Sequence, residues 1–440
     1  MKIAVIGAGP CGLIATKTLR QYGIEASCFE TSSFLGGHWK IDNPSGKSAA
    51  YESLTTNTNK VMSRLSDFEM PSEWPDLPSH ELMYEWWCSY AETFDLLNHI
   101  NFEHEVIEIK RDPSQWIIQY KNFENTHEAN FDGVVLASGN FWLPKTPELP
   151  GNFSGRTLHS LDYRSPTRPF QCVDQRVLVV GSGNTGCEIA LELSKHGAKE
   201  VFLSARSGNW ILPKYIEGPD GLEHIAARVP LNHPLDEVPW ALRVLPESWR
   251  NKVFSKVAQI AFKRQFSSYA EQLVANGMPP PPENPLTKRP AVADGLAEAL
   301  SQEQLRAVPA IKDVTDHQVT FTNGVTAEID TIIFATGFHL SYPYLDQEIL
   351  NTANDDMTLF RGLMHPQHHS LFVVGVSRPS GGFWPVAEAQ SHFIGKLLTN
   401  EYKLPGQRTI DRHSNSVLQA ESYNPALYGY ALREESQRKQ

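Results

Sequence analysis

The stretch VVGSGNTGCEIA (residues 179–190) decides the fold class, because it places a glycine-rich turn between an apolar strand and a helix. Gly181, Gly183 and Gly186 give the turn the spacing GxGxxG. In such a turn the first glycine permits the tight bend, the second lets the backbone approach a pyrophosphate, and the third lets the helix pack on the strand. The helix then presents unpaired N–H groups to the phosphates. The stretch therefore predicts a dinucleotide-binding α/β unit.

The chain opens with a second turn of the same kind, MKIAVIGAGPCGLIA (residues 1–15), with Gly7, Gly9 and Gly12 at the same spacing. Two turns predict two bound dinucleotides. We expect further contacts from neighbouring residues of both turns, namely Ala8, Pro10, Cys11, Asn184, Thr185, Cys187 and Glu188.

The second strand of each unit predicts which dinucleotide it binds. Glu30 lies 23 residues after Gly7, where a carboxylate binds ribose hydroxyls and repels a 2′-phosphate. The same count from Gly181 leads to Ser204, with Arg206 two residues further on. A missing acid and a nearby guanidinium suit a 2′-phosphate, although Arg206 as a solvated loop cation is the alternative. The first unit is therefore predicted to bind FAD and the second NADPH, so that one dinucleotide supplies the hydride and the other receives it.

Composition narrows the class of protein. A chain of 440 residues with 41% hydrophobic residues predicts two or three globular domains. A net charge of −11 argues against nucleic acid as a partner. No apolar run suits a transmembrane segment and no secretory leader is visible. The five cysteines are widely spaced, which favours reduced thiols in a cytoplasmic protein. A homodimer is compatible with the sequence.

The order of the motifs predicts an α/β fold with two Rossmann-like domains, the NADPH domain being inserted into a split FAD domain. We expect the FAD domain at residues 1–170 and 330–440, and the NADPH domain with a helical insertion at 171–329. SLFVVGV (370–376) is expected to complete the FAD domain. The amphipathic, basic stretch 236–276 is expected to pack over the NADPH domain, and a membrane-surface helix is the alternative.

The remaining sequence excludes several chemistries. The chain has no close cysteine pair for a disulfide reductase, and no His, Cys or carboxylate cluster has metal-ligand spacing. No serine or cysteine triad is suggested. The flavin must therefore carry the reaction, while the protein positions and shields it.

At this point the residues resemble a known family. FSGRTLHSLDY (153–163) matches FxGxxxHxxxY, and between two GxGxxG turns this pattern is similar to the identifying sequence of flavin-containing monooxygenases. GGHW (36–39), YESLTTNTNKVMSRLSDFEMP (51–71), SARSGNW (204–210) and FATGF (334–338) extend the resemblance over nearly the whole chain.

The resemblance implies a reaction cycle. NADPH reduces FAD, O₂ adds at the flavin C4a carbon, and the hydroperoxide transfers one oxygen atom to a nitrogen or sulfur of a small lipophilic amine or sulfide. A Baeyer–Villiger monooxygenase is the alternative within this chemistry, although those relatives usually have Trp in place of Tyr163. An NADPH-dependent flavin oxidase or diaphorase, without oxygen transfer, is a second alternative.

The resemblance also implies roles for single residues. Asn57 and Asn184 are expected at the reacting flavin and the nicotinamide, although Asn57 as a turn cap and Asn184 as a helix-start residue are the alternatives. His159 is expected to hold the domain linker through hydrogen bonds. The remaining expected cofactor contacts are Gly37, His38, Trp39, Thr56, Thr58, Val106 and Gln390.

Overall fold

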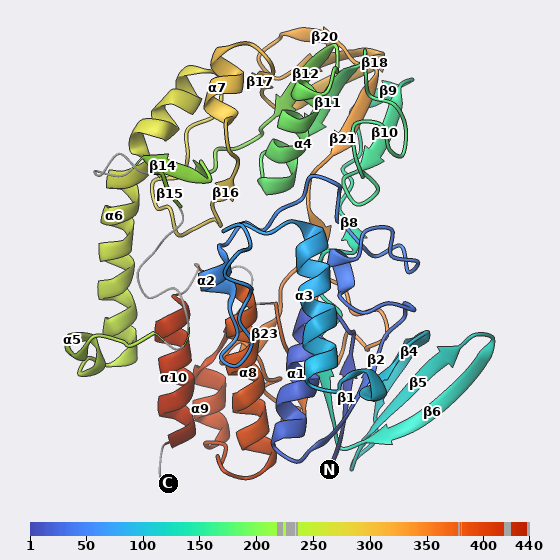
Figure 1. Cartoon of the computed structure of the whole chain (residues 1–440), viewed down its shortest axis with the longest axis vertical. Coiled ribbons are helices and arrows are strands. Elements are labelled where there is room, and N and C mark those ends of the chain that lie inside the picture. The colour runs from blue at the N-terminus through green and yellow to red at the C-terminus, as the bar shows by residue number, and fades with distance from the viewer. Residues whose placement is uncertain are drawn as a thin grey trace.

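The computed structural model describes residues 1–217, 223–225, 234, 236–376, 379, 381–417 and 424–437. Two parallel sheets of five strands each organise this part of the chain, one in the lower and one in the upper half of Figure 1. This arrangement confirms the predicted α/β class with two dinucleotide-type units.

The first sheet has the strand order β24-β7-β1-β2-β3. Its strands are β1 (Lys2–Ile6), β2 (Glu25–Phe29), β3 (Ile100–Asn101), β7 (Gly133–Leu136) and β24 (Leu371–Val373). The central strands are apolar because helices and loops bury both faces of a parallel sheet. β24 comes from near the end of the chain and pairs Leu371 with Val134. As predicted, this late strand completes the first sheet.

Helices cover the first sheet. α1 (Pro10–Gln21) begins at Pro10, whose fixed φ and missing N–H suit the first helical position. It packs against α8 (Phe383–Leu398). α3 (His80–Thr93) adds an aromatic cluster, in which the ring centroids of Trp87 and Trp384 are 5.2 Å apart. The first unit therefore has a dense core beneath its glycine turn.

A three-stranded antiparallel sheet extends from the first sheet at the lower right of Figure 1. It consists of β4 (His104–Arg111), β5 (Trp116–Asn122) and β6 (Asn125–Phe131). Trp116 is fully buried, and its indole N–H donates to the Ser370 hydroxyl at 2.9 Å. This bond ties the extension to the loop that leads into β24.

The second sheet has the strand order β10-β21-β11-β12-β17. Its strands are β10 (Arg156–His159), β11 (Arg176–Val180), β12 (Glu200–Ser204), β17 (Arg306–Val308) and β21 (Thr331–Phe334). α4 (Asn184–Lys195) follows its glycine turn and packs against α7 (Leu296–Ser301).

This sheet corrects the expected domain boundary at one strand, because β10 lies within the expected segment 1–170 yet pairs in the second sheet. The strand in DTIIFATGF (330–338), which is expected to close the second unit, is β21 and does so, although the domain range 330–440 includes it with the first unit. The reason is that every residue of β21 is buried, so its backbone needs hydrogen-bonded neighbours on both edges. β10 and β11 supply those edges. The insertion of the second unit into the first otherwise remains a proposal.

The two chain crossings between the sheets run side by side, because β8 (Leu143–Pro144) pairs antiparallel with β22 (Phe338–His339). A four-stranded sheet contains β9 (Gly151–Phe153), β18 (Ile311–Asp316), β19 (Gln318–Phe321) and β20 (Thr326–Glu328). The shorter elements are η1 (Gly37–Trp39), α2 (Lys60–Ser63), η2 (Leu97–His99), β13 (Ile211–Leu212), β14 (Tyr215–Glu217), β15 (Glu223–Ile225), β16 (Ala291–Val292), β23 (Thr358–Phe360), α9 (Gln407–Arg412) and β25 (Ser414–Ser416).

Two helices of the insertion, α5 (Trp240–Arg243) and α6 (Glu247–Ala275), form the outer left edge of Figure 1, with α10 (Pro425–Gln437) beside the lower half of α6. Phe262 and Phe266 of α6 pack with Trp210 of the second unit. Phe254 packs with Leu427 of α10. The predicted packing over the second unit is confirmed for the C-terminal half of α6, whereas the N-terminal half contacts α10. No helix in the described part of the chain combines the length and the apolar composition that a membrane crossing requires.

Candidate active site

Both glycine turns have the close backbone approach that their spacing predicts. Gly7 and Gly181 adopt φ values of +104° and +115°, which favour glycine. A Cβ at Gly12 would lie 1.7 Å from the Gly7 carbonyl oxygen, and one at Gly186 would lie 1.8 Å from that of Gly181. Each helix can therefore pack this tightly on its strand only with glycine at that position.

The middle glycines border the space that a pyrophosphate needs. No atom lies within 4 Å of a Cβ built on Gly183. At Gly9 the nearest atom to such a Cβ is the Gly37 Cα, at 3.6 Å. The expected contact residue Gly37 therefore lies against the first turn, where it has a φ of +57°.

Glu30 is fixed beside the first turn. Its carboxylate accepts the Ala8 N–H at 2.7 Å and the Ser32 N–H at 2.8 Å. Burial raises the pKa of Glu30, while these backbone hydrogen bonds act in the opposite direction. Each carboxylate oxygen keeps a further lone pair, so Glu30 can still accept a ribose hydroxyl.

Cys11 and Val106 complete the surroundings of the first turn. Cys11 lies in the first turn of α1, and burial raises the pKa of its thiol to about 12. Val106 lies in β4, two residues after His104, whose N–H donates to the Glu30 carbonyl. Both residues are thus next to the cofactor-binding elements of the first unit. The raised pKa of the Cys11 thiol makes it a poor nucleophile.

At the end of β12, the Ser204 side chain does not point to a ribose as expected. Ser204 is buried and donates its hydroxyl to the Pro309 carbonyl at 2.9 Å, so the structure directs it away from a ribose. Arg206 is exposed, and within the described residues it forms no ion pair. Lys288, which the sequence reasoning missed, donates to the Ser207 hydroxyl at 3.0 Å in the same loop. Two cations therefore lie where an adenosine 2′-phosphate is expected.

The start of α4 contributes the polar side chains of the second turn. The amide oxygen of Asn184 accepts the Val292 N–H at 2.6 Å. This hydrogen bond fixes the side chain against the 285–292 segment, so Asn184 does more than begin the helix. Thr185 lies in the same first helical turn. Cys187 is fully buried, and burial raises the pKa of its thiol to about 12.

A cavity of about 900 Å³ brings the two units together, because Asn57 and Thr58 of the first and Asn184 of the second all line it. Its other walls come mainly from α6, the 285–292 segment and α10. Phe254, Phe262 and Leu427 give it an apolar character. Sequence reasoning did not assign these walls, since the residues are scattered over elements far apart in the chain.

Asn57 has the orientation of a ligand-binding side chain. Its amide oxygen is buried, and in the described structure it has no hydrogen-bond partner. The turn-capping alternative belongs to another residue, since Asn59 accepts the Met62 N–H at the start of α2. The Thr56 hydroxyl is likewise buried and without a partner, whereas the Thr58 hydroxyl contacts Ser63 at 2.9 Å.

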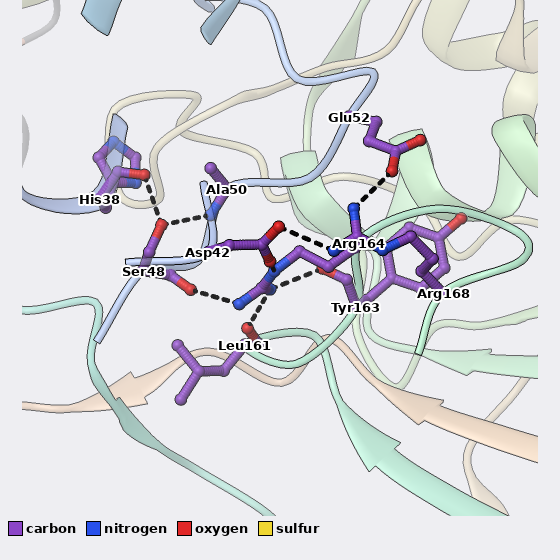
Figure 2. Close-up of polar contacts among 9 residues, drawn as sticks. All are labelled: His38, Asp42, Ser48, Ala50, Glu52, Leu161, Tyr163, Arg164 and Arg168. Atoms are coloured by element: carbon purple, nitrogen blue, oxygen red, sulfur yellow. Dashed lines mark hydrogen bonds and ion pairs between the residues drawn. The ribbon is translucent and has the colours of Figure 1, made fainter. Parts of the chain in front are cut away.

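The turn at residues 37–39 forms one side of the first unit's site. His38 and Trp39 are in edge contact, with ring centroids 4.7 Å apart. Burial, together with nearby His80, lowers the pKa of His38 to about 4, so His38 is neutral at physiological pH. Figure 2 shows that the Ser48 hydroxyl donates to the His38 carbonyl, at 2.8 Å.

Arginines connect the loop that follows this turn to the domain crossing, as Figure 2 shows. Arg164 donates to the Asp42 carboxylate at 3.1 Å and to the Leu161 carbonyl at 2.7 Å. Arg168 pairs with Asp42 at 2.7 Å and with Glu52 at 2.9 Å. The segment that carries Asn57 is therefore anchored, through the preceding loop, to the linker between the two units.

Phenol–carboxylate pairs join the two units beside the cavity. Tyr51 donates to Glu188, and Tyr163 donates to Glu192 at 2.7 Å, one helical turn further along α4. Burial raises the pKa of both carboxyl groups. Lys214 lies 3.5 Å from Glu188 and donates to Thr55 at 2.8 Å, two residues before Asn57. Glu188 is thus engaged between the units, and sequence reasoning missed its partners Tyr51 and Lys214.

Two predicted residues have internal partners. His159 contacts the Gly337 carbonyl at 3.0 Å and accepts the Leu161 N–H, which agrees with its expected role at the linker. Gln390 is fully buried and donates to the Gly362 carbonyl and to the Tyr428 hydroxyl. Both amide hydrogens of Gln390 are therefore used within the protein, which favours a structural role over the expected cofactor contact.

Comparisons with known proteins agree with this geometry. A family model described as "Flavin-binding monooxygenase-like" matches residues 1–432. The chain is 31% identical to human flavin-containing monooxygenase 2 over 93% of its own length and 75% of that protein, and 30% identical, over comparable shares, to rabbit flavin-containing monooxygenase 3.

Solved structures share the fold. S-allyl-L-cysteine S-oxygenase from Allium sativum superposes with a TM-score of 0.69 at 20% identity, over all of this chain and 89% of that one. A cyclohexanone monooxygenase superposes with a TM-score of 0.71 at 18% identity, covering 98% and 97% of the two chains. The family match over nearly the whole length, together with two glycine turns of the dinucleotide-binding type, shows that this chain belongs to the flavin-binding monooxygenase family.

Proposed function

We propose that the protein is an FAD-containing monooxygenase that uses NADPH and O₂ to transfer one oxygen atom to a nitrogen or sulfur of a small lipophilic substrate. A flavin held by the first unit supplies the redox and oxygen chemistry when bound. The curated relatives include dimethylaniline monooxygenases named as N-oxide-forming. A structural neighbour, OTEMO, is described in complex with FAD and NADP.

One observation carries this proposal, namely the buried and unpartnered amide oxygen of Asn57 at a cavity shared with Asn184. An unsatisfied buried polar atom costs about 1–3 kcal/mol, so a bound group that satisfies it is favoured. An amide can donate and accept hydrogen bonds without supplying a titrating proton. The first turn with Glu30 would hold FAD, and the second turn with Arg206 would hold NADPH.

The charged side chains that line the cavity are mostly basic. Among its described lining residues the only carboxylate is Glu247, whose two oxygens lie 2.7 and 2.9 Å from the same guanidinium nitrogen of Arg361. Lys252 and Lys256 also line the cavity and repel a protonated amine. We therefore expect a neutral thioether to be oxygenated more efficiently than a tertiary amine of similar size.

A product assay tests this function against both alternatives. The holoenzyme is incubated with NADPH, air and, in turn, a thioether, a matched tertiary amine and a cyclic ketone, and the oxygenated products and H₂O₂ are quantified. Sulfoxide or N-oxide in proportion to the NADPH consumed supports the proposal. Lactone without sulfoxide would establish a Baeyer–Villiger enzyme, a fold-compatible alternative given the cyclohexanone monooxygenase neighbours. H₂O₂ alone would establish an oxidase.

We also propose a reducing, cytoplasmic setting for the enzyme. All five cysteines are free, and burial raises the pKa of every one of their thiols. Thiols of this kind are poor nucleophiles and do not form the disulfides typical of secreted proteins. Fractionation of cells that express the tagged chain tests this proposal.

A further inference from the structure

Two lysines of α6, Lys252 and Lys256, lie on the side of the helix that is turned towards the protein. At about 100° per residue, both positions lie within roughly 60° of the direction midway between Phe266 and Ala270, two buried residues of the same helix. Both lysines line the cavity that also contains Asn57. They are exposed, so a ligand in the cavity can reach their ammonium groups.

These two lysines have no anionic partner in the described part of the chain, where neither forms an ion pair or a hydrogen bond. Residues 248–270 contain no Asp or Glu, so α6 itself offers no counter-charge near them. Like charges four residues apart on a helix face repel each other. An anion bound between Lys252 and Lys256 would relieve this repulsion.

The cavity does not supply such an anion from its own described lining. The only carboxylate there is Glu247, and its two oxygens lie 2.7 and 2.9 Å from one guanidinium nitrogen of Arg361. Arg289 also lines the cavity and adds a further cation. The wall formed by α6 is therefore positively charged towards the space that a substrate would occupy.

The rest of the cavity suits an apolar group. Phe254 and Phe262 of α6 and Leu427 of α10 contribute to its walls. Its volume of about 900 Å³ is within the range of sites that hold drug-sized ligands. One apolar region and one pair of free ammonium groups match a molecule that has an apolar part and an anionic end.

We propose, resting on the function proposed above, that the preferred substrate is a thioether that carries a carboxylate, bound by Lys252 and Lys256. The ammonium groups hold the carboxylate as point charges, while the apolar part and the sulfur extend into the cavity that contains Asn57. NADPH and the thioether each give two electrons to O₂. One oxygen atom forms the S–O bond, and the other leaves as water with the NADPH hydride and one solvent proton.

Sulfoxidation by the FAD-loaded full chain, with NADPH and air, tests this substrate class. The substrates are a methylthio-substituted phenylacetate, its neutral amide and the corresponding phenylethylammonium ion, which place the charge or the amide at nearly the same distance from sulfur. The charge variant is Lys252→Gln/Lys256→Gln, and Lys252→Arg/Lys256→Arg retains both charges. Lys121→Gln/Lys312→Gln, at exposed lysines outside the cavity lining, removes the same charge and is the matched control.

We expect the unmodified enzyme to favour the carboxylate over the amide, and the ammonium ion to be the poorest of the three substrates. An exposed lysine–carboxylate pair contributes up to about fivefold in affinity, so two pairs predict a preference of roughly 5- to 25-fold in kcat/KM. Removing both charges should bring this ratio close to one, chiefly through KM, because the carboxylate does not react. The arginine variant and the matched control should keep the ratio.

Three outcomes would contradict the proposal, each in a different way. Equal kcat/KM values for the carboxylate and the amide in the unmodified enzyme overturn the substrate class and leave the monooxygenase function standing. H₂O₂ without sulfoxide from any of the three substrates overturns the function and the substrate class with it. An unchanged ratio in Lys252→Gln/Lys256→Gln, with a raised KM for NADPH, assigns the two lysines to a phosphate of the coenzyme instead.

Discussion

The replacement Arg206→Ala tests how the second unit chooses its coenzyme. Ser204 occupies the position of the acid that would read a ribose 2′-hydroxyl, and its own hydroxyl is bonded to the Pro309 carbonyl. Selectivity must therefore come from a group that meets the 2′-phosphate. Arg206 is exposed two residues after the end of β12 and has no ion-pair partner among the described residues. Its guanidinium is available for this phosphate.

The expected contribution of Arg206 to the preference for NADPH over NADH depends on how exposed its side chain is. A hydrogen bond to a charged group contributes about 1.5–3 kcal/mol net. At 1.4 kcal/mol per tenfold, this range corresponds to a preference for NADPH over NADH of roughly 10- to 150-fold in kcat/KM. Salt screens an exposed pair, so we expect the lower end, about tenfold, from Arg206 itself. Lys288, in contact with the same loop, is positioned to supply the remainder.

The assay is flavin reduction in the absence of O₂, followed with NADPH and with NADH. Arg206→Ala should weaken the response to NADPH about tenfold and leave NADH nearly unchanged, since only NADPH carries the phosphate. Lys199→Ala, at an exposed lysine of the same unit, is the matched control. Ser204→Ala should not alter the preference. A variant at Arg206 that retains the full preference would refute the assignment and the 23-residue alignment of the two units.

Three further replacements test the flavin side of the site, the second glycine turn and the stability of the fold. Asn57→Leu should leave NADPH oxidation largely intact but divert oxygen to H₂O₂, and unchanged product per NADPH consumed would exclude this role. Gly186→Ala places a Cβ 1.8 Å from the Gly181 carbonyl oxygen, so NADPH should no longer bleach the flavin while dithionite still does. Hydrogen bonding to Arg176 lowers the pKa of Asp330 to about 2. Because this value is below that of the unfolded chain, the ion pair stabilises the protein above about pH 4 and its contribution is lost as the pH falls towards 2. Asp330→Asn should therefore reduce the free energy of unfolding at pH 7 by about 1 kcal/mol, a value discounted for solvent exposure, and urea titrations at pH 7 and pH 3.5 should show the difference shrinking.

The sequence was sufficient for the parts of the fold that depend on local geometry. A GxGxxG turn has few conformations that avoid backbone clashes, so the turns at Gly7 and Gly181 could be predicted from spacing alone. The position of Glu30 beside the first turn followed from the fixed distance between the first two strands of such a unit. The boundary at residue 170 could not be predicted in this way, because the pairing of β10 with β21 joins strands more than 170 residues apart.

The site was less predictable where contacts are non-local. Asn57 could be found from the resemblance of its segment, but the identity of the capping residue, Asn59, depends on where α2 begins. The walls of the cavity come from α6 and α10, whose packing no local pattern specifies. Gln390 was expected at a cofactor, yet its amide is consumed by Gly362 and Tyr428 through tertiary contacts.

The position of Tyr163 changes how the two oxygenation chemistries can be distinguished. Its phenol is buried and donates to Glu192 on α4, and it does not belong to the described lining of the cavity. A residue that never touches the substrate cannot select between a ketone and a thioether by direct contact. The Tyr163–Glu192 and Tyr51–Glu188 pairs instead set how the two units meet, and therefore where Asn184 lies relative to Asn57. Under the proposed function, the choice of chemistry depends on groups that line the cavity, which makes Asn57 and the lysines of the cavity wall the informative positions.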